Sequence, residues 1–219
     1  MIITIDGPVA AGKTTAAREL AIRLGYTLLD TGAIYRSLAL SARNRGIDYE
    51  DEAALATTAA GLGLVFRFEG GRNRVLLDGD DVTEAIRHPD VSQAASIVSA
   101  LPDVRAALLE LQRQIARRGK VVAEGRDTGT VVFPDADAKF FVTADDEVRA
   151  ARRHRELHQK GRDDSLEQVL AELRDRDSRD SSREVAPLVP ADDATIIDTT
   201  GLDGEAVIRK ILGVLAERS

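Results

Sequence analysis

The hydrophobic pattern of the first part of the chain alternates between short apolar runs and helical stripes. Residues 2–5 form a β-branched run that is typical of a buried strand, and residues 14–24 place apolar side chains at helical spacing before Gly25. Residues 26–29 predict a second short strand, and residues 34–45 continue with helical spacing. Strand and helix therefore alternate from the start, which is the order found in a parallel α/β sheet.

The pattern changes after this helix. Residues 50–60 predict a short alanine-rich helix, and residues 64–77 predict a hairpin whose turn, at 69–73, contains glycine. Two more helical patterns follow, at 91–100 and at 103–117, and the second carries a clear amphipathic stripe. Because this stretch interrupts the alternation of strand and helix, we interpret it as an insertion.

The alternation resumes in the second half of the chain. Residues 120–124, 139–142 and 195–198 predict three more strands, a helix begins at Asp145, and residues 202–215 predict a closing helix. The chain therefore has five short apolar strands separated by helices and by one insertion. At 219 residues it is long enough for one domain with a substantial insertion.

One late helix changes character along its length. Ser165-Leu166-Glu167-Gln168 matches a capping box, which starts the helix. Its inward stripe is apolar at first and then charged, in the order Leu166, Val169, Leu170, Leu173, Arg176, Asp180 and Arg183, with Arg179 one step to the side. A helix does this when its second half leaves the core and lines a cleft that holds an anion. The alternative is a solvated helix end.

The clearest chemical motif lies between the first strand and the first helix. Residues 7–14 spell the phosphate-binding loop G-x-x-x-x-G-K-[ST], so a nucleoside triphosphate is the implied ligand. Gly7 and Gly12 allow backbone N–H groups to converge on one anion, Lys13 reaches the β and γ phosphates, and the Thr14 hydroxyl can ligate Mg²⁺. The residues assigned to the triphosphate are Gly7, Pro8, Val9, Ala10, Ala11, Gly12, Lys13, Thr14 and Thr15. The alternative is a glycine-rich turn without a ligand.

Two further motifs follow predicted strands. Asp30-Thr31-Gly32 resembles an aspartic-protease signature, but no second copy exists and helical spacing follows, so we expect a helix cap with Thr31 and Arg36 facing the same cleft as Lys13. Arg126 and Asp127 follow the strand at 120–124, and doubly wound sheets bind ligands at the carboxyl ends of their strands. The alternative for the first motif is a helix cap with a surface arginine, and the alternative for the second is an ion-paired surface loop.

Composition and charge narrow the class of protein. The 30 basic and 37 acidic residues give a net charge of −7, which argues against a nucleic-acid partner held mainly through phosphates. The absence of cysteine excludes disulfides and thiolate catalysis. No segment approaches about 18 apolar residues in a row, so we expect a cytoplasmic protein without a membrane partner.

Taken together, these motifs resemble those of bacterial cytidylate kinases, which are nucleoside monophosphate kinases, over essentially the whole chain. The matching segments are Ile-Asp-Gly-Pro with the phosphate loop, Leu-Leu-Asp-Thr-Gly-Ala-Ile-Tyr-Arg, Gly-Arg-Asp-Thr-Gly-Thr-Val-Val-Phe-Pro-Asp-Ala, Arg-Asp-x-Arg-Asp and Ala-Pro-Leu-Val-Pro-Ala. The resemblance implies one α/β kinase domain over 1–219. Its P-loop NTP-hydrolase-type parallel sheet core would have helices on both faces. The parts would be the core at 1–30, 119–144 and 166–219, a monophosphate-binding insertion with a small antiparallel sheet at 31–118, and a short lid at 145–165.

The resemblance also implies a reaction and residue roles. The γ-phosphoryl group of ATP, with Mg²⁺ bound, would pass to CMP or dCMP, and we expect the enzyme to be a monomer. Cytosine would be surrounded by Thr31, Ser96, Arg105 and Asp127; the monophosphate would be held by Arg36 and Arg126, the pentose by Arg176 and Asp180, and the transferred and acceptor phosphates by Arg179 and Arg183. Arg153 in the lid would approach ATP, and Lys13, Arg126 and Arg179 would be catalytic.

Two rival functions share the phosphate loop. A regulatory GTPase would also fit Asp198-Thr199-Thr200-Gly201, but an N-K-x-D motif is absent because Asn44 and Asn73 are each followed by Arg. A kinase for another small acceptor is the stronger rival. The residues alone leave both open.

Overall fold

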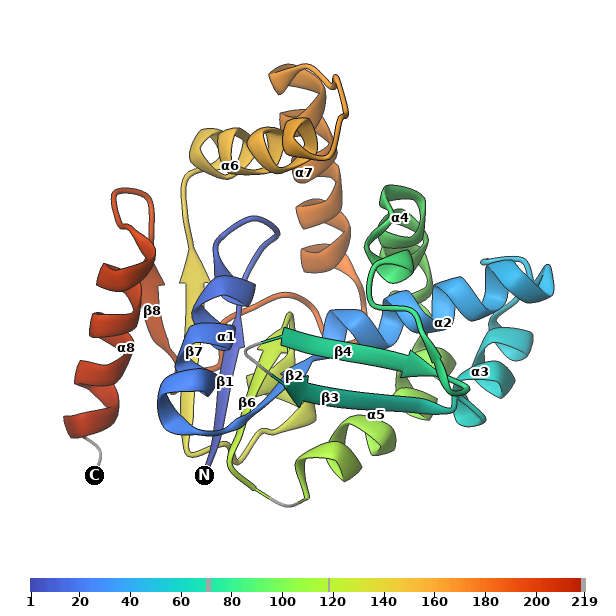
Figure 1. The fold of residues 1–219 in the computed structure, drawn as a ribbon, viewed down its shortest axis with the longest axis horizontal. Helices are drawn as coiled ribbons and strands as arrows, with labels where there is room; N and C mark the ends of the chain where they lie inside the picture. The colour runs from blue at the N-terminus through green and yellow to red at the C-terminus, as the bar shows by residue number, and fades with distance from the viewer. Residues whose placement is uncertain (70–71, 118, 218–219) are drawn as a thin grey trace.

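The computed structural model describes residues 1–69, 72–117 and 119–217 (Figure 1). Its centre is a five-stranded sheet in the order β2-β6-β1-β7-β8, and every neighbouring pair is parallel. The strands are β1 (Ile2–Asp6), β2 (Thr27–Asp30), β6 (Val121–Gly125), β7 (Ala138–Thr143) and β8 (Thr195–Asp198). The five predicted strands are confirmed, and no bound shifts by more than one residue.

Successive side chains of each strand point to opposite faces of this sheet, so both faces carry apolar side chains. Leu28 and Val122 belong to one buried cluster, while their neighbours Leu29 and Val121 belong to another on the other face. Helices cover both clusters, as the sequence predicts. The helices on the first face are α1 (Lys13–Leu24) and α8 (Gly204–Glu217), and those on the second are α2 (Thr31–Arg45), α3 (Glu52–Ala60), α4 (Pro89–Val98) and α5 (Pro102–Ala116).

A second, small sheet lies beside α2 and α5 (Figure 1). It is antiparallel, in the order β3-β4-β5, and comprises β3 (Leu64–Glu69), β4 (Arg72–Leu77) and β5 (Asp80–Asp81). The predicted hairpin is confirmed, although the turn glycines Gly70 and Gly71 lie outside the described residues. The sequence missed β5, because two exposed aspartates carry no hydrophobic pattern.

The helices α6 (Asp146–Gln159) and α7 (Leu166–Ser182) form an arm above the carboxyl ends of the central strands (Figure 1). The capping box is confirmed, because Ser165 and Gln168 exchange backbone-to-side-chain hydrogen bonds of 2.8 and 3.2 Å. Two details of the predicted stripe are wrong. Leu166 is exposed, because it lies in the first turn beyond the small cluster formed by α6 and α7. Arg183 lies outside α7, because the chain turns back there and the Arg183 Nε donates to the Ala186 carbonyl.

No helix in the described part of the chain is long and apolar enough to span a lipid bilayer.

Asp6, at the carboxyl end of β1, holds the loop that follows β6. Its carboxylate accepts hydrogen bonds from the Thr128 N–H at 2.9 Å, the Thr128 hydroxyl at 2.7 Å and the Gly129 N–H at 2.7 Å. Burial raises the pKa of Asp6, and these three hydrogen bonds oppose that rise. They fix the π-helical turn η2 (Thr128–Val132), which the sequence did not predict, and with it the adjacent Arg126 and Asp127.

We expect Asp6→Asn to lower the free energy of unfolding by about 2–4 kcal/mol, because the amide NH₂ then faces the Gly129 N–H and leaves a buried donor without an acceptor. Urea denaturation followed by circular dichroism measures this loss. The matched control is Asp198→Asn at the end of β8, where the exposed carboxylate accepts the same pair of bonds from Thr200. The control should lose far less stability; equal losses in the two variants would contradict this role of Asp6.

Candidate active site

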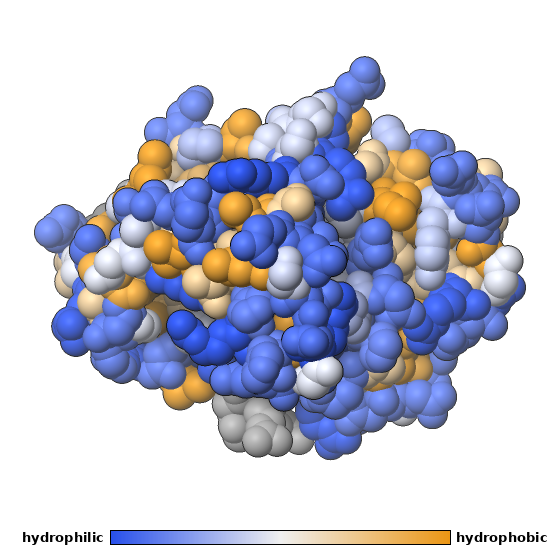
Figure 2. All heavy atoms as spheres, turned by 90° about the horizontal axis from the view of Figure 1, so that it is seen from above, coloured by the Kyte–Doolittle hydropathy of each residue, from blue (hydrophilic) through white to orange (hydrophobic). Residues whose placement is uncertain are grey.

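A cavity of about 520 Å³ lies at the carboxyl ends of the central strands, beneath the α6–α7 arm. Parallel α/β sheets place their ligand sites at this edge. Seen from this side, strongly hydrophilic side chains gather around the middle of the molecule (Figure 2). The predicted residues that line the cavity are Val9, Ala10, Ala11, Gly12, Lys13, Thr14, Thr15, Thr31, Arg36, Arg105, Arg126, Asp127, Arg153, Arg176, Asp180 and Arg183.

The phosphate loop forms one wall of this cavity. Gly12 has a φ of 96° and caps the N-terminus of α1, so the first N–H groups of the helix are available to an anion. Lys13 is buried, and its Nζ donates to the Pro8 carbonyl at 2.5 Å. Gly7 has a φ of 145°, and a Cβ there would overlap the Val142 carbonyl of β7. Gly7 therefore serves to seat the loop against the sheet and does not line the cavity.

A buried carboxylate, which the sequence analysis missed, lies beside Thr14. The Glu124 Oε2 accepts a hydrogen bond from the Thr14 hydroxyl at 2.8 Å, while its buried Oε1 has no hydrogen-bond partner in the described part of the chain. Burial raises the pKa of Glu124 to about 7, and burial together with the nearby Arg126 lowers the pKa of Lys13 to about 7. A hydroxyl and a carboxylate oxygen are the kind of ligand that Mg²⁺ prefers, so these two residues fit that ion.

Arginines held by carboxylates line the same cavity. Arg36 of α2 donates to Asp30 at 2.8 Å, and the Arg126 Nε donates to Asp180 of α7, also at 2.8 Å. The Asp30 carboxylate also accepts from the Ala33 N–H, which confirms the predicted helix cap. In each pair the carboxylate fixes a guanidinium that faces the cavity.

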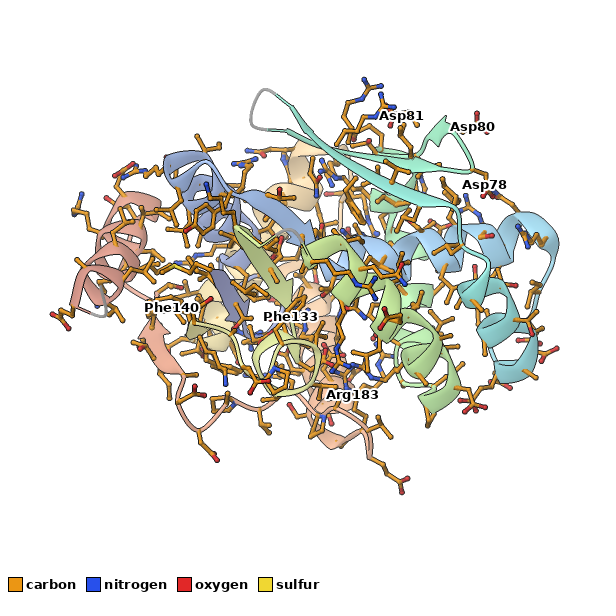
Figure 3. The ribbon with its side chains drawn as sticks, turned by 90° about the horizontal axis from the view of Figure 1, so that it is seen from below. Asp78, Asp80, Asp81, Phe133, Phe140 and Arg183 are labelled. Carbon is orange, nitrogen blue, oxygen red and sulfur yellow. The ribbon has the colours of Figure 1, made fainter. Side chains whose placement is uncertain are left out.

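A second group of buried charges lies deeper, where α5 meets the loop after β6. Arg105 donates to Asp127, and the Arg183 Nη2 lies 3.6 Å from the same carboxylate. The guanidinium of Arg105 also lies over the ring of Tyr35, 5.6 Å from its centroid. Figure 3 shows Arg183 at the end of α7, well away from Asp78 in the β4–β5 turn and from Asp80 and Asp81 of β5. Tyr35 lines the cavity too, although no sequence motif predicts a role for it.

Four of the predicted residues do not line this cavity: Gly7, its neighbour Pro8, Ser96 and Arg179. Ser96 and Arg179 line an adjoining cavity of about 760 Å³ between α4 and α7, which shares Arg153 and Arg176 with the first. Ser96 is buried, and its hydroxyl has no hydrogen-bond partner among the described residues. The structure therefore separates these two side chains from Lys13, with Arg153 and Arg176 on the boundary.

A phosphate loop with a lysine and a buried carboxylate, lining one cavity together with several arginines, defines a P-loop phosphotransferase that brings two anionic groups together. Among solved structures, shikimate kinase from Bacteroides thetaiotaomicron has the same fold, with a TM-score of 0.50 at 12% identity over 99% of this chain and 98% of that one.

A family model described as Cytidylate kinase matches residues 3–217. A cytidylate kinase of Shewanella loihica is 49% identical over 218 residues, which cover 99% of this chain and 95% of that protein. One of Geobacter sulfurreducens is also 49% identical, over 100% of this chain and 94% of that protein. The chain belongs to the cytidylate kinase family.

Arg176 gives a test of the repulsion among the positive charges that line the cavity. Its Nε is buried without a hydrogen-bond partner in the described residues, and burial together with the neighbouring Arg126 lowers its pKa to about 10. We expect Arg176→Met to stabilise the ligand-free protein by about 1 kcal/mol, which is about 2–4 °C in Tm for a chain of this size. The rise in Tm that pyrophosphate gives should shrink in the variant.

The control for this prediction is Arg174→Met, which removes the same charge from the exposed face of the same helix. Its surface ion pairs contribute little, so its Tm should change by no more than about 1 °C. A lower Tm for Arg176→Met, with the pyrophosphate response unchanged, would contradict repulsion between Arg176 and Arg126.

Proposed function

We propose that this cavity carries out the reaction of the cytidylate kinase family, in which the γ-phosphoryl group of ATP passes to CMP and gives CDP and ADP. The observation that carries the proposal is that the phosphate loop and the carboxylate-held arginines line one and the same cavity. As the sequence resemblance implies, dCMP is a second acceptor. The shikimate kinase shares only the fold, so it does not favour a different acceptor.

The donor side consists of the phosphate loop and Glu124. The loop N–H groups and Lys13 bind the β and γ phosphates of ATP, and Arg153 approaches the nucleotide from α6. Thr14 and Glu124 hold Mg²⁺, and the orphaned Glu124 oxygen is the support for this assignment. When bound, Mg²⁺ neutralises charge that develops on the phosphate oxygens.

The acceptor side consists of the arginines and Asp127. Arg36 and Arg126 bind the monophosphate, while Arg176 and Asp180 contact the pentose. Thr31, Arg105 and Asp127 lie near the cytosine ring, where the carboxylate accepts from the exocyclic amino group. The support for these roles is that all of these side chains line the cavity and that the arginines already face it. A phosphate can replace the carboxylates on Arg36 and Arg126, so that each guanidinium keeps an anionic partner.

The transfer itself needs alignment and charge stabilisation. The acceptor phosphate is an anion at neutral pH, so no base with a shifted pKa is required. Lys13, Arg126 and Arg179 stabilise the transferred phosphoryl group, and Arg183 steadies the acceptor phosphate. Arg179 and Ser96 border the adjoining cavity, so closure of the lid at 145–165 over the insertion at 31–118 completes their contacts with substrate and excludes water.

The assembly and location of the enzyme are part of the same proposal. As the sequence resemblance implies, we propose that the enzyme is a monomer. CMP and ATP are nucleotides of the cytoplasm, and we place the enzyme there.

The test is ADP formation measured in parallel with CMP, dCMP, UMP, AMP and shikimate as acceptors. CMP should give the highest kcat/KM, followed by dCMP. Lys13→Met should remain folded and lose at least about 10³-fold in kcat, because nothing else supplies a mobile cation at the β and γ phosphates. Faster turnover of shikimate or AMP than of CMP, or a loss below tenfold in Lys13→Met, would overturn the proposal.

Asp127 gives a separate test of base recognition. Uracil has a carbonyl where cytosine has an amino group, so the wild type should prefer CMP to UMP by roughly 10³-fold in kcat/KM. Asp127→Ala should raise the KM for CMP far more than that for ATP and erase most of this preference. Because Asp127 is buried against Arg105, Asp127→Asn serves as the variant of matched shape. Comparable turnover of CMP and UMP by the wild type would contradict the role of Asp127 in recognising the cytosine amino group.

A further inference from the structure

Arg149 of α6 is a buried arginine that lines neither cavity. Its Nε donates to the Ala144 carbonyl at 3.1 Å, its Nη1 to the Val9 carbonyl at 3.0 Å and to Asp177, and its Nη2 to Asp146. All three guanidinium nitrogens therefore donate to the protein, and the side chain is held by four acceptors from three segments of the chain. Such a residue orders its neighbours and is not an anion site.

Asp177 of α7 completes the arrangement. Its Oδ2 accepts from Arg149, and its Oδ1 accepts from the Val9 N–H at 3.4 Å. Val9 is the second variable residue of the phosphate loop, and both its N–H and its carbonyl are thus held by the α6–α7 arm. The loop that receives ATP is tied directly to the helix that carries Arg176 and Asp180.

Resting on the function proposed above, we propose that Arg149 and Asp177 are positioning residues that set the distance and orientation between the donor phosphates and the acceptor. Arg176 and Asp180 lie one and three residues from Asp177 on the same helix. A shift of α7 relative to the phosphate loop therefore moves the acceptor contacts away from the γ phosphate. Phosphoryl transfer depends on in-line alignment, and a misplacement of about 1 Å can cost roughly 10² in rate.

The arginine fork is essential to this role. One guanidinium has a fixed planar geometry that reaches a loop carbonyl and two carboxylates together, whereas a lysine ammonium is a point charge on a flexible stem. Arg149→Lys keeps the charge and much of the volume but cannot hold these acceptors at once. Asp177→Asn keeps the shape and removes the charge that Arg149 faces.

A simpler explanation is that Arg149 only fastens α6 to α7. Arg174 provides the matched control, because it joins the same two helices through Asp146 at 3.1 Å and Glu147 at 3.4 Å. It does so on the exposed side and does not touch the phosphate loop. Arg174→Lys therefore tests the fastening alone.

The experiment compares the wild type with Arg149→Lys, Asp177→Asn, the double variant and Arg174→Lys. It measures kcat with CMP, the binary dissociation constants of ATP and of CMP by calorimetry, and the ratio of ADP to CDP formed.

We expect Arg149→Lys and Asp177→Asn to lose about 30–100-fold in kcat, with each binary affinity changed by less than about threefold. ADP should form in excess of CDP, because water hydrolyses ATP that is not aligned with the acceptor. The double variant should be little worse than either single variant, because the two residues act together. Arg174→Lys should stay within about twofold of the wild type in every measurement.

Three results would overturn the inference. They are an unchanged kcat in a folded Arg149→Lys or Asp177→Asn, an equal loss in Arg174→Lys, and a fall in binary ATP affinity as large as the fall in kcat. If Arg149→Lys does not fold, as judged by circular dichroism, the folded Asp177→Asn decides between these outcomes. Failure of the wild type to phosphorylate CMP would instead refute the proposed function, so the two failures are distinguishable.

Discussion

Positive charge crowded around one cavity is the constraint on which the site depends. Arginines from α2, α5, α7 and the loops after β6 and α7 converge with Lys13 on a space of about 520 Å³. Like charges so close together repel, and burial weakens the hydration of each. Carboxylates offset this cost in the ligand-free chain, with Asp30, Asp127 and Asp180 each paired to arginine. The same pairs keep the guanidinium groups aimed at the cavity, so the site is organised before any phosphate arrives.

The sheet brings these charges together through its register. The ends of β1, β2 and β6 lie side by side, with Asp30 opposite Glu124 and Asp6 opposite Gly125. The three acids differ in what they hold, since Asp6 fixes the loop after β6, Asp30 caps α2 and holds Arg36, and Glu124 faces Thr14. The carboxyl edge of the sheet is therefore a row of acids that arranges the cations above it.

Much of this arrangement could be predicted from the sequence, because strands and motifs are local. The phosphate loop, the capping box at Ser165 and the apolar runs each depend on neighbouring residues, and the structure contains all of them. Glu124 was missed because an acid at the end of an apolar run has no motif of its own. Its role appears only when β6 lies beside β1 and brings it against Thr14.

Long-range geometry explains the other differences. The sequence placed Arg183 on a helical stripe, but it reaches Asp127 from the turn after α7. Likewise Arg179 and Ser96 come from α7 and α4, and the separation of these helices leaves them in the adjoining cavity. Helical periodicity gives the face of a helix on which a side chain lies and says nothing about where that helix ends or which cavity it borders.

The most direct test of this charge arrangement is a crystal structure of the chain with CMP and a non-hydrolysable ATP analogue bound. We expect the phosphate of CMP to take Arg36 from Asp30 and Arg126 from Asp180, which frees Asp180 for the pentose, while Asp127 faces the cytosine amino group. Arginines that stay on their carboxylates, with CMP bound outside this cavity, would contradict the assignment.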